Sequence, residues 1–157
     1  MPIVIQLSRV LYQGVLADLR RPHAHAAERI GFFYGRLTSG DQHSIVMRRY
    51  VPVQDEHYVV DDTVGARING DAIRTAMQGV LDVGDGVFHT HIHEWPGQPE
   101  FSLTDEDELP NLIPAFRAVG PTQATGLFLL SPDSAIADVW LPGAWGPERA
   151  TRISIVG

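Results

Sequence analysis

Hydrophobic and polar residues alternate along this chain with the periods of strands and helices. The apolar, β-branched run at 2–7 is typical of a first strand. Ser8 suits the N-cap of a helix whose apolar residues recur at helical spacing to about Arg21. Asp71 is expected to cap a second helix, which runs to about Leu81 and turns an apolar face toward the core. Two helices are therefore predicted in the first half of the chain.

Strand patterns fill much of the rest. Further strands are predicted at 31–37, at 44–53, in a histidine-bearing run near 90, at 124–131, at 134–143 and at 151–157. The segment 54–70 has a weak pattern and is expected to be an irregular or hairpin excursion. Residues 104–118 indicate a helix broken by Pro110 and Pro114. This order predicts an α+β fold, a mixed sheet flanked by helices, in one domain of residues 1–157.

The histidine-bearing strand carries candidate metal ligands. His89, His91 and His93 alternate along it, so their side chains are expected on one face. A turn-rich loop then leads to Ser102 and Asp105, at a predicted helix start. Imidazoles fixed on a strand and a carboxylate brought back by a loop form a ligand set that zinc accepts, with a further position left for water. The sequence therefore predicts a metal site.

Composition excludes several other functions. The formal charge is −7 and no basic cluster is present, so neither nucleic acid nor an anionic membrane is the expected partner. The absence of cysteine excludes disulfides, cysteine-ligated zinc and a cysteine nucleophile. The N-terminal sequence lacks the apolar core of a signal peptide, and no apolar run approaches membrane-spanning length. A cytoplasmic protein is therefore expected.

Two features before the second strand have weaker local signals. His23 and His25 also have His-x-His spacing, but they lie among alanines without a strand pattern, and we interpret them as surface histidines. Glu28 precedes the predicted strand at 31–37. From its local sequence it is either a general base at the mouth of that strand or a solvated charge.

Taken together, these pieces resemble the JAB/MPN (JAMM) zinc metallopeptidases. The matching residues are Glu28 before Gly31-Phe-Phe-Tyr-Gly35, then Gly86-Val-Phe-His89-Thr-His91, then Ser102-Leu-Thr-Asp105. The resemblance covers nearly the whole chain and implies a curved mixed sheet with two or three helices. It also implies that His89, His91 and Asp105 bind one Zn²⁺ per chain. Glu28 would then move the proton of the attacking water, and Ser102 would help to hold the oxyanion.

The family motif can be placed on this chain in two registers. The family usually has Pro after its second ligand histidine, whereas Ile92 follows His91 here. The loop from His91 to Ser102 is also longer than the family's common spacing. A register with His91 and His93 as ligands shortens that loop. We prefer His89 and His91 because the Gly-Val-Phe-His-Thr-His entry matches, which makes His93 an outer or substrate-side residue.

The resemblance implies a function. Active family members mostly cleave peptide or isopeptide bonds after the C-terminal tail of ubiquitin or a ubiquitin-like protein. This lysine-free and cysteine-free chain looks like the bacterial stand-alone members, some of which occur beside conjugation enzymes in antiphage systems. We therefore expect an isopeptidase that deconjugates or processes a ubiquitin-like protein, with segment 54–70 pairing with the substrate tail as an added strand. The alternatives are a non-catalytic scaffolding domain of the same fold and a cupin-like metal protein.

Overall fold

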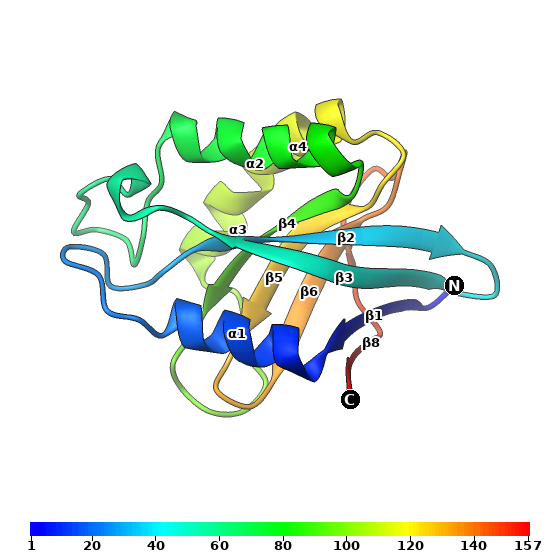
Figure 1. Ribbon diagram of the computed structural model, residues 1–157, viewed down its shortest axis with the longest axis horizontal. Coiled ribbons are helices and arrows are strands. Elements are labelled where there is room, and N and C mark those ends of the chain that lie inside the picture. Colours follow the sequence, from blue (N-terminus) through cyan, green and yellow to red (C-terminus); the bar gives the residue numbers. More distant parts are fainter.

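The computed structural model describes residues 1–157, which form one curled eight-stranded sheet with helices on both faces (Figure 1). The strands are β1 (Ile3–Ser8), β2 (Gly31–Ser39), β3 (His43–Pro52), β4 (Gly86–Ile92), β5 (Thr125–Leu130), β6 (Ala135–Trp140), β7 (Glu148–Arg149) and β8 (Arg152–Val156). The helices are α1 (Arg9–Leu19), α2 (Gly70–Val83), α3 (Leu103–Glu108) and α4 (Ile113–Val119), with short 3-10 turns at Asp55–His57 and Leu109–Leu112. The predicted α+β class is confirmed.

The curl of the sheet follows from its strand order, β7-β6-β5-β4-β2-β3-β1-β8. Strands β7 and β8 are at opposite ends of this order, yet only residues 150–151 join them in sequence. The two ends of the sheet must therefore approach each other. Parallel pairs, such as β4 with β5, and antiparallel pairs, such as β2 with β4, are both present, so the sheet is mixed as expected.

Two hydrophobic clusters lie on opposite faces of the sheet. Phe33 of β2 belongs to the cluster that α1 covers with Val15 and Leu19. Its neighbour Phe32 points to the other face and belongs to the cluster that includes Phe116 of α4 and residues of α2. Figure 1 shows α1 on one side of the sheet, with α2 and α4 on the other. The helices on both faces distinguish this fold from a helix-poor barrel of the cupin kind.

Some predicted boundaries are confirmed and others are wrong. The Ser8 hydroxyl accepts a hydrogen bond from the Leu11 backbone N–H, so Ser8 caps α1 as predicted. Helix α2 starts at Gly70 with Asn69 as its cap, rather than at Asp71, because the Asn69 side chain accepts from Ala72 N–H. Leu81 is 60% exposed instead of facing the core. None of the helices has the length and apolar character needed to cross a lipid bilayer.

Candidate metal centre

The candidate site lies where β4 ends beside the start of β2. These strands are antiparallel, with Gly31 paired to Thr90, so residues just before β2 lie next to the last residues of β4. Strand β5 supports β4 on its other side, and the His93 backbone N–H still donates to the Leu130 carbonyl at 2.9 Å. Because this bond extends the ladder by one residue, His93 is held as firmly as the strand itself. The end of β4 is therefore a rigid platform.

Two imidazoles on this platform converge on one carboxylate. His91 Nε2 lies 3.1 Å from Asp105 Oδ2, and His93 Nε2 lies 3.4 Å from the same oxygen. Both histidines are almost fully buried, with exposed fractions of 2% and 5%. Their Nδ1 atoms are also buried and have no hydrogen-bond partner. Both imidazoles thus contact one carboxylate oxygen.

The start of α3 fixes the orientation of Asp105. Ser102 and Asp105 form a capping box, in which the Ser102 hydroxyl accepts from Asp105 N–H at 3.0 Å and Ser102 N–H donates to Asp105 Oδ2 at 2.9 Å. Burial raises the pKa of Asp105, but the contacts with His91 and Ser102 outweigh burial, and the net shift lowers the pKa. Asp105 is therefore held as a carboxylate.

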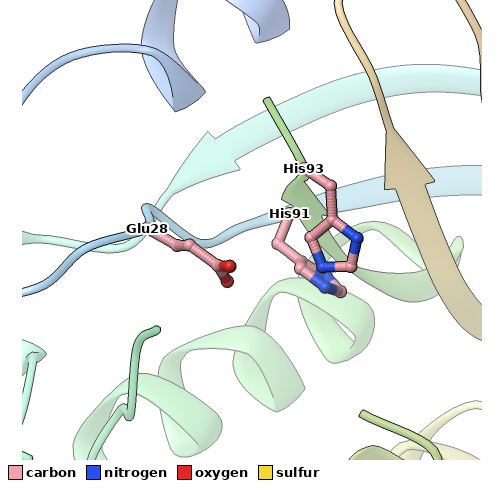
Figure 2. A group of neighbouring side chains, drawn as sticks. All are labelled: Glu28, His91 and His93. Atoms are coloured by element: carbon pink, nitrogen blue, oxygen red, sulfur yellow. The ribbon is translucent and has the colours of Figure 1, made fainter. Parts of the chain in front are cut away.

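Glu28 completes the group from the segment before β2. One ligand atom from each of Glu28, His91 and His93 lies within 4.8 Å of the others. Figure 2 shows the Glu28 carboxylate pointing toward the two imidazole rings. Burial raises the pKa of Glu28, and the neighbouring His91 and His93 oppose that shift without cancelling it. A carboxylate with a raised pKa is suited to accepting and returning a proton.

These residues fit a zinc ion. In a tetrahedral zinc site with bonds of 2.0–2.2 Å, two ligand atoms are about 3.3–3.6 Å apart. The separations of 3.1 and 3.4 Å between the two Nε2 atoms and Asp105 Oδ2 are close to that spacing. Two neutral nitrogens and one carboxylate oxygen are also a common zinc ligand set. The ligand atoms that lie within 4.8 Å of one another come from Glu28, His91 and His93, and Asp105 contacts both imidazoles, so these four residues are the ones that would hold a metal ion.

The structure does not bring His89 into this group, which favours the second register of the motif. Its side chain is on the same face of β4 but farther from the strand end, with its ring 6.0 Å from that of Phe32 in an edge-on contact. Burial, together with His91, lowers the pKa of His89 to about 3. His89 is therefore a neutral buried side chain outside the cluster of Glu28, His91 and His93, and its ligand role stays a prediction.

Sequence reasoning missed two other residues at the site, Gly65 and Trp95. A Cβ atom built on Gly65 would lie 2.5 Å from the Glu28 carboxyl carbon, and the Gly65 carbonyl accepts from Glu28 N–H at 2.9 Å. Only the absence of a side chain at 65 lets this loop lie against Glu28. The Trp95 indole packs on His93, with ring centroids 5.0 Å apart. The one sequence feature that points to Trp95 is its place two residues after His93.

Three adjacent cavities lie in a row along the site, and we call this row the cleft. The first, about 410 Å³, has His89 on its lining together with apolar residues that include Ile30, Ile68 and Leu112. The second, about 170 Å³, lies between residues 63–66 and the start of α3, with Glu28 on its wall. The third, about 400 Å³, lies on the Trp95 side. The small middle cavity shares lining residues with both larger ones, so the cleft passes the candidate metal centre.

No protein-family model matches this chain, and no curated protein matches it. Among solved structures, it is similar to protein DSY2949 from Desulfitobacterium hafniense, known from a solution structure, with 17% sequence identity and a TM-score of 0.48 over 96% of this chain and 93% of that one. It is also similar to the STIL N-terminal domain from Trichoplax adhaerens, with 11% identity and a TM-score of 0.41 over 87% of this chain and 40% of that one.

Proposed function

We propose that this protein is a zinc-dependent peptidase or isopeptidase of the JAB/MPN kind. The observation that carries the proposal is the cluster of ligand atoms from Glu28, His91 and His93, together with the contacts of both imidazoles with Asp105 Oδ2. A JAB/MPN-like fold agrees with the curled mixed sheet and with the position of Glu28 before β2. We propose His91, His93 and Asp105 as the zinc ligands. This choice corresponds to the second register of the motif, in which His93 takes the place of His89.

The surrounding residues would divide the chemistry among them. A bound zinc ion would polarise the scissile carbonyl and lower the pKa of an attacking water molecule. Glu28 would accept a proton from the water and return one to the leaving amine, for which its raised pKa is suited. The Ser102 hydroxyl oxygen accepts from Asp105 N–H, which leaves its own proton free to be donated to the oxyanion.

The proposed substrate is the C-terminal tail of a ubiquitin-like protein. The middle cavity, between residues 63–66 and Ser102, is the smallest of the three at about 170 Å³, which suits an extended tail with small residues next to the scissile bond. The segment after β3 supports this reading, since Tyr58 pairs with Ile68 and Val59 N–H donates to the Arg67 carbonyl at 2.8 Å. This hairpin-like segment borders the apolar cavity and offers a strand to which a tail adds.

The test is cleavage of a ubiquitin-like tail fusion by zinc-loaded protein and its Glu28→Gln variant. Glu28→Gln keeps the shape of the side chain and removes the proton acceptor. We expect it to retain zinc and to lose cleavage by roughly a hundredfold or more. Glu106→Gln is the matched control, because Glu106 is an exposed glutamate one residue from Asp105 that lines none of the three cavities.

Three outcomes separate the candidate functions. Loss of cleavage in Glu28→Gln with zinc retained supports the hydrolase. Full activity in that variant rules out the proposed role of Glu28. Bound zinc without cleavage of any tail fusion by the unmodified protein favours the alternative, a non-catalytic metal-binding or scaffolding domain.

A further inference from the structure

The third cavity of the cleft differs from the first in the residues that line it. It has a volume of about 400 Å³ and lies between the loop after β4 and Glu28. Trp95 and Phe101 supply aromatic rings, whereas Gln98 and Glu100 supply polar groups. The cavity at the opposite end of the cleft has mainly apolar residues around it. The two ends of the cleft are therefore chemically different.

Trp95 gives this cavity a fixed aromatic wall. Its indole lies 5.0 Å from the His93 ring at an interplanar angle of 31°, so one face is held against a buried side chain. The residue is nevertheless 61% exposed. A large aromatic ring that is anchored on one side and open on the other is a ready platform for a ligand, above all a cationic one.

Two carboxylates line the cavity. Glu100 is exposed and makes no ion pair or hydrogen bond through its side chain, and Glu28 contributes a second carboxylate. Two arginines of the surrounding segments are paired: Arg20 with Glu94 at 3.5 Å, and Arg149 with Asp138 at 2.6 Å. Arg149 also lies over the Phe101 ring, 5.6 Å from its centroid. Arg152 forms no ion pair but lines a different cavity, which shares Gln98 with this one. Glu100 itself has no ion-pair partner.

We propose that this cavity binds a cationic side chain on the leaving-group side of the scissile bond. The proposal rests on the proposed hydrolase function. The hairpin-like segment borders the other two cavities, so the tail that contributes the acyl group enters there. The Trp95 cavity then receives the residue that follows the scissile bond. An arginine there stacks on the open face of Trp95 and pairs with Glu100.

The experiment uses zinc-loaded protein and three ubiquitin tail peptides that differ only in the residue after the scissile bond, which is Arg, Gln or Glu. We expect kcat/KM for the Arg peptide to exceed that for the Glu peptide by roughly tenfold, from one cation–π contact and one exposed ion pair. Glu100→Arg is expected to reverse the order, and this exposed position makes misfolding no concern. Glu106→Gln should leave the order unchanged.

A binding measurement keeps the result separate from catalysis. Calorimetry with the short amides Arg-Ala and Glu-Ala, the leaving fragments of two of these peptides, reports on the cavity without any cleavage. Preferred binding of Arg-Ala that is lost in Glu100→Arg supports the cavity even where no peptide is cut, in which case only the hydrolase proposal fails. Cleavage of all three peptides at equal rates overturns this inference and leaves the hydrolase intact. Equal binding of the two amides without cleavage overturns both.

Discussion

Two pairs of histidines in this chain have the same His-x-His spacing, and their surroundings differ in every respect that matters for metal binding. His23 and His25 lie in the loop between α1 and β2, where His25 is exposed. His91 and His93 lie at the end of β4 and are buried. The two pairs share their spacing but not their sequence surroundings, and the fold shows what the difference means for each pair.

Both ring nitrogens of His23 contact backbone groups. His23 Nδ1 accepts from the N–H groups of His25 and Ala26 at 3.3 and 3.2 Å, and His23 Nε2 lies 3.3 Å from the Asp55 carbonyl oxygen. The His23 ring also packs against the ring of Tyr58, with centroids 4.4 Å apart. These contacts hold a loop in shape, which is the surface role that the sequence suggested.

The second pair has its nitrogens directed at carboxylates. The Nε2 atoms of His91 and His93 meet at Asp105, and Glu28 faces the same point. The difference teaches that spacing selects candidate ligands, whereas a rigid strand, burial and a converging carboxylate decide which candidates can hold an ion.

The largest expected effect is on zinc affinity, and it distinguishes the buried histidine pair directly from the pair His23 and His25. His91→Ala and His93→Ala each remove a nitrogen ligand, and we expect zinc affinity to fall by more than about a hundredfold, since even outer partners of a ligand are worth ten- to a hundredfold. His23→Ala should keep the zinc content of the unmodified protein. Elemental analysis after gel filtration makes the measurement. Equal loss from all three variants would contradict the contrast.

The next effect decides between the two registers of the motif. His89→Phe replaces a buried neutral ring with another ring, in a position beside the apolar cavity. We expect this variant to bind zinc like the unmodified protein, whereas His93→Ala does not. Thermal unfolding of both variants controls for folding. Zinc retained by His93→Ala and lost from His89→Phe would restore His89 as the ligand.

The sequence was enough for much of the fold because its strongest patterns are local. The apolar run of β5 predicted a buried central strand, and all six of its residues are buried between β4 and β6. The two prolines after Asp105 predicted a broken helix, and α3 and α4 are separate. Strand β7 was missed because two residues, Glu148 and Arg149, carry no recognisable period.

The local sequence pattern could not decide which of the three histidines are ligands. His89, His91 and His93 share one face of β4, so alternation alone ranks them equally. Which two meet Asp105 depends on where the loop after His93 returns to the sheet. That position is set by tertiary contacts, such as Gly97 N–H donating to Asp133 at 2.8 Å. The Gly65 contact with Glu28 joins segments far apart in sequence and had no signal at all.

A smaller effect is expected from moving Glu28, the carboxylate that faces His91 and His93. Substitution of Gly65 can move it. Gly65→Ala places a methyl group against the end of a flexible Glu28 side chain, so the chain stays folded while the carboxylate moves. We expect zinc to be retained and tail cleavage to fall by roughly tenfold to a hundredfold, as for other small displacements of a catalytic group. Gly40→Ala is the control, since a Cβ there meets nothing. Unchanged kcat in Gly65→Ala would show that Glu28 does not need its present position.

The smallest effect concerns the surroundings of the first pair. Asp55 binds the buried Arg29 at 2.7 Å, and that hydrogen bond lowers the pKa of Asp55. A carboxyl whose pKa is lower in the folded than in the unfolded chain stabilises the fold above the unfolded value of about 3.9, and this stabilisation is lost as pH falls through the folded value. Asp55→Asn should therefore lower the urea midpoint slightly at pH 7, with the difference narrowing below about pH 4. Asp55 is exposed and its charge is screened, so the effect is modest, and zinc content should not change. A difference in midpoint that is the same at every pH would assign it to packing, not charge.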